Sequence, residues 1–272
     1  MMGEPAGRFL ELTTGATYVV DERPQGQERG TFLLVHGATV PHWEFDRLAP
    51  LLLGDGWRVV RFDLAGHGLS ALPAADYSFE PFLAQGLGVL DSIEADKVAL
   101  LGHSFGAAVA AALASERPSR VSRLVLVAPL LDFMAGKVWA RAFGLPGVGP
   151  LIMRHVGVPS LIRRRRQRYS AIGAESLATR FAEEARMAGY AEALASMFRQ
   201  GTLSDHQDRY WRLRLNRMRM LVVAGSEDSV VPLVDVGRVR ALLPSHEYVE
   251  LTGAQHNLLL THASSVAEAI AD

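Results

Sequence analysis

The stretch KVALLGHSFGAAVAAALASE, residues 97–116, contains the pattern that decides the fold. An apolar run is followed by the pentapeptide GHSFG at 102–106 and then by an alanine-rich segment. This order predicts a strand, a sharp turn and a helix, the setting in which the serine of a G-x-S-x-G motif can be a nucleophile. Such a turn crowds the backbone, so small residues such as Gly102 and Gly106 are expected on either side of it. Ser104 is therefore the candidate nucleophile.

The composition indicates a globular chain with enough apolar residues for a large core. The chain has 272 residues, of which 49% are hydrophobic, and this fits one large α/β domain or two small ones. Its 28 basic and 29 acidic residues leave a formal charge of −1, so no overall field favours nucleic acid or an anionic membrane. The absence of cysteine excludes disulfides, thiolate metal sites and a cysteine nucleophile.

No segment indicates secretion or a membrane span. The first residues, MMGEP, are polar, and no uninterrupted apolar stretch reaches the roughly 18 residues of a transmembrane helix. We therefore expect a soluble, cytoplasmic protein without integral membrane association. Its expected partner is a small-molecule acyl substrate rather than nucleic acid.

Strand and helix patterns alternate through most of the chain. A hairpin is predicted at 9–13 and 17–21, followed by apolar strands at 31–35, 57–62, 98–101, 124–127, 218–224 and 247–251. Helical patterns lie between and after them, at 42–53, 80–93, 104–116, 234–243 and 264–271. Strands that are apolar on both faces and are separated by helices predict an α/β fold, with a parallel sheet covered on both sides.

This alternation is interrupted after Pro129 by roughly 80 residues with helical patterns only, near 158–167, 174–187 and 191–200. We interpret 132–211 as a helical cap inserted between two parts of the core, 1–131 and 212–272. Within the cap, the run RRRRQR at 163–168 is dense in charge, and an anionic substrate or a phospholipid headgroup is one possible partner for it. Because no aromatic residues are interleaved with it, a solvated helix face is the favoured interpretation.

A serine hydroxyl needs a base to take its proton, and the base needs a carboxylate to orient it. In an α/β sheet these groups should follow the ends of strands in the order serine, acid, histidine. Asp228 follows one predicted strand and His256 follows the last one. Glu227 and Asp132 are alternative acids, and Asp228 is preferred because turn residues bracket it on both sides. The predicted catalytic residues are Ser104, Asp228 and His256.

Backbone N–H groups should stabilise the oxyanion that forms during attack on a carbonyl. One donor is expected at Phe105, directly after the nucleophile, and the other at Ala38, in the loop where Gly37 permits close approach. His36 is expected to brace this loop. No histidine lies at metal-ligand spacing from a second ligand, so we expect neither a metal site nor a cofactor.

Five motifs, taken together, resemble the α/β-hydrolase superfamily. They are LLVHG at 33–37, RFDLAGHGLS at 61–70, GHSFG at 102–106, the loop at 225–232 and the segment at 253–256. The resemblance implies a mostly parallel eight-stranded sheet with helices on both faces, together with the triad and oxyanion donors named above. The cap matches no particular subfamily, so the resemblance indicates the mechanism better than the substrate.

The nucleophile favours acyl chemistry. Haloalkane dehalogenases and epoxide hydrolases of this superfamily have an aspartate where this chain has Ser104. We therefore predict a carboxylesterase or lipase-like serine hydrolase of small to medium esters. The alternatives are a C–C bond hydrolase of a vinylogous diketone and a ligand receptor that keeps the hydrolase pocket. Apolar cap residues, among them Phe133, Trp139, Phe143 and Met197, are predicted to line the acyl pocket.

Overall fold

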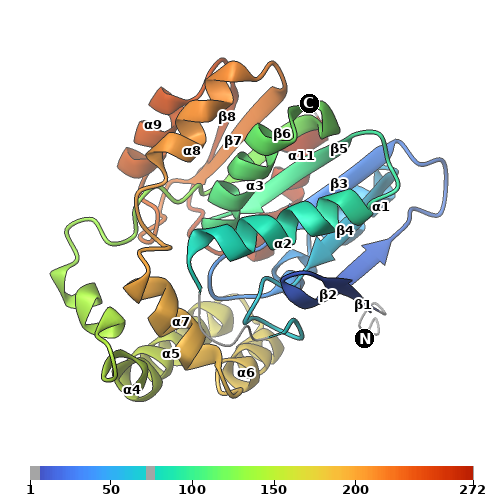
Figure 1. Ribbon diagram of the computed structural model, residues 1–272. Helices are drawn as coiled ribbons and strands as arrows, with labels where there is room; N and C mark the ends of the chain where they lie inside the picture. The colour runs from blue at the N-terminus through green and yellow to red at the C-terminus, as the bar shows by residue number, and fades with distance from the viewer. Residues whose placement is uncertain (1–6, 72–76, 272) are drawn as a thin grey trace.

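The computed structural model describes residues 7–71 and 77–271, which form an eight-stranded sheet flanked by helices (Figure 1). The strands lie in the order β1-β2-β4-β3-β5-β6-β7-β8. Their bounds are β1 Arg8–Leu12, β2 Gly15–Glu22, β3 Gly30–Val35, β4 Trp57–Phe62, β5 Val98–His103, β6 Val121–Val127, β7 Arg219–Gly225 and β8 Glu247–Leu251. The β1–β2 and β2–β4 pairs are antiparallel and the remaining pairs are parallel, which confirms the predicted mostly parallel sheet.

Alternate residues of the central strands contribute to two apolar cores, one on each face of the sheet. In β3, Leu33 and Val35 belong to one core, while Phe32 and Leu34 belong to the other. Successive side chains of a strand point to opposite faces, so a strand that is apolar throughout must be covered on both sides.

Two groups of helices cover these faces (Figure 1). One core contains residues of α2 Phe79–Ser92, α3 Phe105–Glu116, α8 Gln207–Arg212 and α9 Leu233–Leu242. The other contains residues of α1 Ala49–Gly54, α10 Leu258–Thr261 and α11 Ala263–Ala271. The longer helices α2, α3, α9 and α11 begin and end within one residue of the predicted bounds.

The helix predicted at 42–53 is not continuous. A 3-10 helix occupies His42–Phe45, and α1 begins only at Ala49, with Pro50 in its first turn. Proline has no N–H to donate to the carbonyl four residues earlier, so it fits the first turn of a helix and interrupts a longer one. The prediction of one helix here is therefore wrong.

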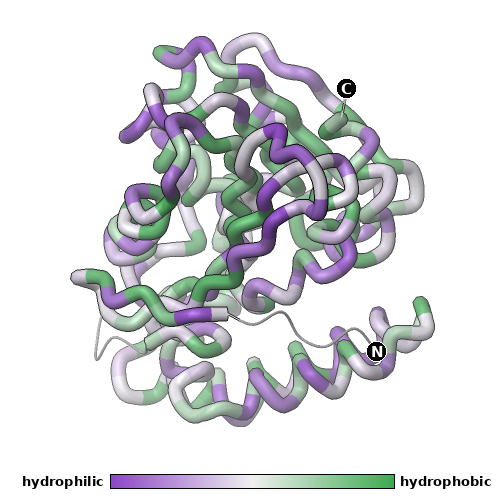
Figure 2. Tube along the Cα trace, turned by 90° about the vertical axis from the view of Figure 1, so that its right-hand side faces the viewer, coloured by the Kyte–Doolittle hydropathy of each residue, from purple (hydrophilic) through white to green (hydrophobic). Residues whose placement is uncertain are grey.

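The segment between β6 and β7 is helical, as predicted. Its longer helices, α5 Val158–Ser170, α6 Glu175–Glu184 and α7 Tyr190–Arg199, gather with the short α4 Gly149–Ile152 at the bottom of Figure 1. In Figure 2 the helices at the bottom alternate hydrophilic and hydrophobic residues along their length, as amphipathic helices do. Each helix accordingly has buried and exposed positions, such as the buried Phe181 and the exposed Glu183 of α6.

The short helix α8 was not predicted, since six residues are too few to reveal a period. All of it except its last residue falls within the predicted insertion, yet it packs against α3 and α9. The Tyr210 hydroxyl also donates a hydrogen bond to the carbonyl of Leu130 at 2.9 Å. The division at residues 131 and 212 stays a prediction. Among the described helices, none is both long and apolar enough to cross a bilayer.

Candidate active site

The turn between β5 and α3 holds Ser104 in an unusual backbone conformation. Its φ is 55° and its ψ is −119°, values that residues with a side chain rarely adopt. A Cβ atom on Gly102 would overlap the carbonyl of Gly106, and one on Gly106 would overlap the carbonyl of Val35. The close packing of the turn explains both glycines, as the sequence predicts.

Ser104, His256 and Asp228 form a continuous chain of hydrogen bonds. Nε2 of His256 lies 3.1 Å from Oγ of Ser104, and Nδ1 of His256 lies 2.7 Å from Oδ2 of Asp228. The carboxylate favours the tautomer with the proton on Nδ1, so Nε2 can accept the serine proton. The three residues follow β5, β8 and β7, which run parallel within one sheet and end at the same edge. The exposed fractions are 7%, 6% and 5%, respectively.

The environments of the three candidate acids differ. Asp228 is buried, and its Oδ1 accepts hydrogen bonds from the N–H groups of Val230 and Val231 at 2.8 and 2.9 Å. Glu227 is exposed. Asp132 accepts hydrogen bonds from the N–H groups two and three residues further on, so it stabilises its own turn. Asp228 is therefore the candidate that contacts the histidine.

Burial and pairing set the protonation states of this chain of groups. Burial raises the pKa of Asp228, but the hydrogen bond and charge of His256 and the two backbone N–H groups outweigh it and hold that pKa below its usual value. Burial lowers the pKa of His256, and Asp228 opposes that shift only in part. At neutral pH the carboxylate is ionised and the imidazole is neutral, which are the states required of an orienting acid and a general base.

These pKa directions predict the pH dependence of turnover. His256 must be neutral to accept a proton, and its pKa lies below the ordinary value of 6.5. We expect kcat/KM for a neutral substrate to rise with pH to a plateau, with the midpoint of the acidic limb below 6.5. The measurement is a kcat/KM profile at constant ionic strength. A midpoint above 7 would contradict this assignment.

The loop after β3 approaches Ser104 closely. A Cβ atom on Gly37 would lie 3.4 Å from that of Ser104, which is an ordinary contact distance, so the loop is close to Ser104 but the available space does not itself require glycine. Nε2 of His36 accepts a hydrogen bond from the N–H of Leu64 at 2.8 Å, and Nδ1 lies 2.6 Å from the carbonyl oxygen of Gly37. His36 therefore braces the loop, as predicted. The N–H groups of Ala38 and Phe105 donate to no other group in the described part of the chain, so both are available to a ligand.

A second carboxylate and imidazole lie beside the first pair. Oε2 of Glu44 accepts a hydrogen bond from the N–H of Gly37 at 3.0 Å, and its Oε1 lies 2.9 Å from Nδ1 of His103. Nε2 of His103 donates to the carbonyl of His256 at 3.1 Å. Burial raises the pKa of Glu44, but His103 and the backbone N–H outweigh it and lower that pKa to about 2. Sequence reasoning missed Glu44, because its contacts depend on the 3-10 helix at His42–Phe45, where the sequence predicted the start of one continuous helix.

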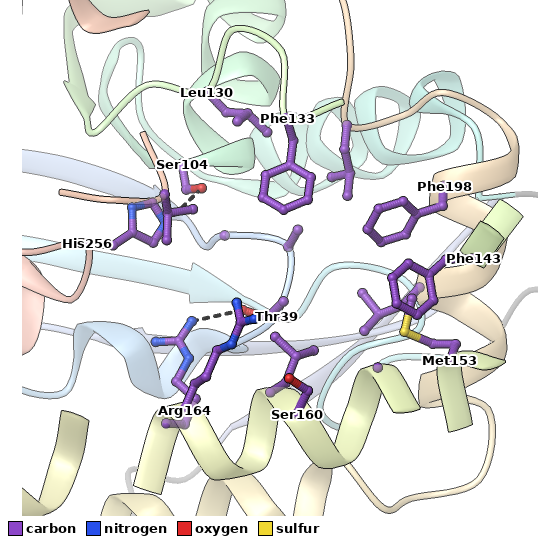
Figure 3. Close-up of a pocket in the computed structure, with 18 of the residues that line it drawn as sticks. Thr39, Ser104, Leu130, Phe133, Phe143, Met153, Ser160, Arg164, Phe198 and His256 are labelled. Carbon is purple, nitrogen blue, oxygen red and sulfur yellow. Dashed lines mark hydrogen bonds between the residues drawn. The ribbon is translucent and has the colours of Figure 1, made fainter. Parts of the chain in front are cut away.

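A cavity of about 360 Å³ opens beside Ser104 and His256 (Figure 3). The predicted cap residues Phe133, Trp139 and Phe143 line it, as do Met153 and Phe198. The prediction that Met197 lines the pocket is wrong, because Met197 is not among the residues that line the cavity and its side chain packs in the apolar core instead. Successive helical residues differ in direction by about 100°, so Phe198 reaches the cavity while its neighbour does not.

Three arginines of the run at 163–168 also line the cavity. They are Arg164, Arg165 and Arg168, and all of them come from α5. The interpretation of the run as a solvated face holds for the exposed Arg163 and Arg166 but is wrong for Arg165, which is only 9% exposed. The spacing i, i+1, i+4 was the available signal, because it places these three residues near one side of a helix.

The described residues contain no group of three histidine, aspartate or glutamate side chains close enough to share a metal ion. The hydroxyl of Ser104, the imidazole of His256 and the carboxylate of Asp228 can together perform nucleophilic attack and proton transfer.

A family model and individual relatives both indicate that this chain is a hydrolase. Residues 30–263 match the model of the alpha/beta hydrolase fold. The chain is 32% identical over 229 residues to a 2-hydroxy-6-oxo-2,4-heptadienoate hydrolase of Pseudomonas putida, which covers 80% of this chain and 79% of that protein. It is 30% identical over 207 residues to a 2-hydroxymuconate semialdehyde hydrolase of a Pseudomonas species, which covers 74% of this chain and 71% of the relative.

A solved structure extends this likeness to the fold. The enol-lactonase from Burkholderia xenovorans matches with a TM-score of 0.79 at 17% identity, over 97% of this chain and 98% of that one. The sheet order, the serine turn and the family match lead to one conclusion. This chain belongs to the α/β-hydrolase family and is a hydrolase.

Proposed function

We propose that this hydrolase cleaves a small to medium carboxylic ester through an acyl-enzyme formed on Ser104. The observation that carries the proposal is the hydrogen-bonded chain from Ser104 through His256 to Asp228 at the wall of a cavity. A serine positioned in this way is suited to attack a carbonyl carbon, because its proton has an acceptor within hydrogen-bond distance.

The reaction proceeds in two halves. Nε2 of His256 takes the hydroxyl proton as Oγ of Ser104 bonds to the carbonyl carbon, and the carbonyl electrons move to oxygen. When that intermediate collapses, the ester C–O bond breaks and His256 gives its proton to the departing alcohol. A water molecule then attacks the acyl-enzyme with His256 as base again, which releases the acid and restores Ser104. Asp228 stabilises the imidazolium that forms in each half.

Ala38 and Phe105 are proposed to stabilise the negative oxygen of both intermediates. Their unengaged N–H groups support this role, as does the position of Phe105 at the first turn of α3, where the helix dipole favours negative charge. Donors that are fixed before the substrate arrives need no reorganisation during the reaction.

The helical segment between β6 and β7 is proposed to act as the cap that covers the acyl chain. Phe143 and Phe198 from this segment lie at one end of the cavity in Figure 3, and Phe133 lies between them and Ser104. An apolar enclosure of this size suits an acyl group and keeps bulk water from it.

A second candidate reaction is hydrolysis of a C–C bond in a vinylogous diketone. The two Pseudomonas relatives favour it, because one is a hydrolase of 2-hydroxymuconate semialdehyde and the other of 2-hydroxy-6-oxo-2,4-heptadienoate. The same serine and histidine would serve, but the leaving group would be a carbon that must receive a proton.

A substrate panel separates the two reactions. We expect p-nitrophenyl esters from acetate to octanoate to be hydrolysed with a higher kcat/KM than 2-hydroxy-6-oxo-2,4-heptadienoate, with Ser104→Ala as the blank. A preference of about a hundredfold or more for the dienoate would move the assignment to C–C hydrolysis. If the wild type hydrolysed neither and Ser104→Ala kept the biological activity, the receptor interpretation would replace both.

A further inference from the structure

One face of α5 brings positive charge into the catalytic cavity. Leu161, Arg164, Arg165 and Arg168 follow the i, i+3, i+4, i+7 spacing of a single helix face, and all four line the cavity that contains Ser104. Arg163 and Arg166 instead line a separate hollow of the same segment. The arginine run therefore has two sides, and only one of them faces the reacting groups.

Arg165 is a buried cation that is in direct contact with no carboxylate of the described residues. Burial alone would lower its pKa, and the charges of Tyr169 and of the more distant Glu44 outweigh that effect and raise it. Its guanidinium donates hydrogen bonds to Oγ1 of Thr39 at 2.9 Å and to the Tyr169 hydroxyl at 3.3 Å, both of which are neutral groups. Within residues 7–71 and 77–271, no aspartate or glutamate forms a salt bridge with Arg164, Arg165 or Arg168. A buried cation with no anion in direct contact has lost its hydration without gaining an ion pair, so the site is suited to receive an anion.

The carboxylates near the cavity are already engaged. Glu44 is the acidic residue among those that line it, and it is held by Gly37 and His103. Asp228 is held by His256 and by two backbone N–H groups. The positive charge of the α5 face is therefore left for a ligand.

The rest of the cavity has the opposite character. Figure 3 shows Arg164 on the side of the cavity nearer Ser104 and His256, while Phe143, Phe198 and Met153 lie toward the other end. A molecule that fills this space would meet cations near its reacting carbonyl and apolar side chains further away. Such a molecule is amphiphilic.

We propose that Arg165, with Arg164 and Arg168, binds an anionic group of the substrate, a carboxylate or a phosphate, while its apolar part occupies the aromatic end. This inference rests on the proposed hydrolytic function and narrows it to negatively charged substrates. Arginine suits the role because its planar guanidinium can bind two oxygens of either group at once.

Arg165 also contacts the loop after β3, which contains the proposed oxyanion donor Ala38. Arg165 donates to Thr39, which is adjacent to Ala38, and the Tyr190 hydroxyl donates to the carbonyl of Thr39 at 3.0 Å. A substrate anion on Arg165 would therefore be held one residue away from a proposed oxyanion donor. The neighbouring residues Ala38 and Thr39 would thus connect the group that binds the reacting carbonyl to the group that binds the charge of the substrate, which would fix the position of one relative to the other.

Binding of inert probes tests the anion site without any catalytic step. We would measure the Kd of wild-type protein by calorimetry for hexanoate, pentyl phosphate and hexanamide, which share an apolar chain and differ in the head group. At least one anion is expected to bind about tenfold or more tightly than the neutral amide, and its affinity should fall as salt is raised. The better anion identifies the head group. Equal affinity for all three probes would overturn the proposal.

Arginine variants locate the effect. We expect the double variant Arg164→Gln, Arg168→Gln and the single variant Arg165→Met each to lose about tenfold or more in anion affinity, with hexanamide binding unchanged. The matched control is Arg163→Gln, Arg166→Gln, on the same helix but outside the cavity. If Arg165→Met does not fold, the double variant decides, because Arg164 is exposed and Arg168 only partly buried. Equal losses in the test and control pairs would overturn the proposal.

Turnover of a neutral ester keeps this inference separate from the proposed function. If wild-type protein hydrolyses p-nitrophenyl butyrate but the anions gain no affinity over hexanamide, only the inference fails. If the anions bind through the three arginines but neither the esters nor the dienoate are hydrolysed, only the proposed function fails. If both hold, we also expect the wild-type protein to have a lower KM for the anionic mono-p-nitrophenyl glutarate than for the neutral butyrate. This difference in KM should disappear in the Arg164→Gln, Arg168→Gln variant.

Discussion

Ser104→Ala and His256→Ala are each expected to abolish nearly all turnover, with a loss of kcat of about a millionfold. Without Oγ there is no atom to form the acyl-enzyme, and without the imidazole the hydroxyl proton has no acceptor at 3.1 Å. Because the two groups act in one step, the double variant should be little worse than either single variant. The measurement is kcat for the best ester of the panel.

Matched controls separate this loss from a change in folding. Ser122→Ala and His155→Ala make the same chemical changes at exposed positions and should keep wild-type turnover. All variants should unfold within a few degrees of the wild type. Losses that add strictly in the double variant would show that Ser104 and His256 do not act as a unit.

Asp228→Asn is expected to lower kcat by about ten-thousandfold. An asparagine in this place can present an N–H to Nδ1 of His256, which favours the tautomer that cannot accept the serine proton. The substitution keeps the size of the side chain, and its oxygen can still accept from the N–H groups of Val230 and Val231. The fold should therefore be retained while the tautomer is lost.

Asp132→Asn and Glu227→Gln are the controls for this result. Asp132 stabilises its own turn and Glu227 is exposed, so each should lower kcat by less than about tenfold. A large loss in Asp132→Asn with a small loss in Asp228→Asn would move the acid to the turn after β6.

The sheet and the triad could be predicted because both depend on local sequence patterns. Strands that are apolar on both faces require a covered parallel sheet, and the ends of such strands meet at one edge. This is why residues as distant in sequence as Ser104 and His256 were expected to meet, and the structure places them 3.1 Å apart. The choice of Asp228 over Glu227 rested on turn residues alone, and burial separates them in the structure.

The surroundings of the triad were harder to predict because they depend on packing between distant segments. The sequence gives the spacing of Arg164, Arg165 and Arg168, but not the neighbour that α5 faces. Met197 and Phe198 are adjacent and both apolar, so composition cannot decide which of them reaches the cavity. The interruption at Pro50 was available in the sequence, since proline fits only the first turn of a helix.

Covalent labelling tests the central claim, that Ser104 is a nucleophile activated by His256, most directly. Wild-type protein would be treated with a fluorophosphonate, digested, and its peptides measured by mass spectrometry. We predict a single adduct on Ser104, formed with loss of fluoride, and a labelling rate at least about a hundredfold lower in His256→Ala. An adduct on another residue, no adduct, or an unchanged rate in His256→Ala would contradict the account.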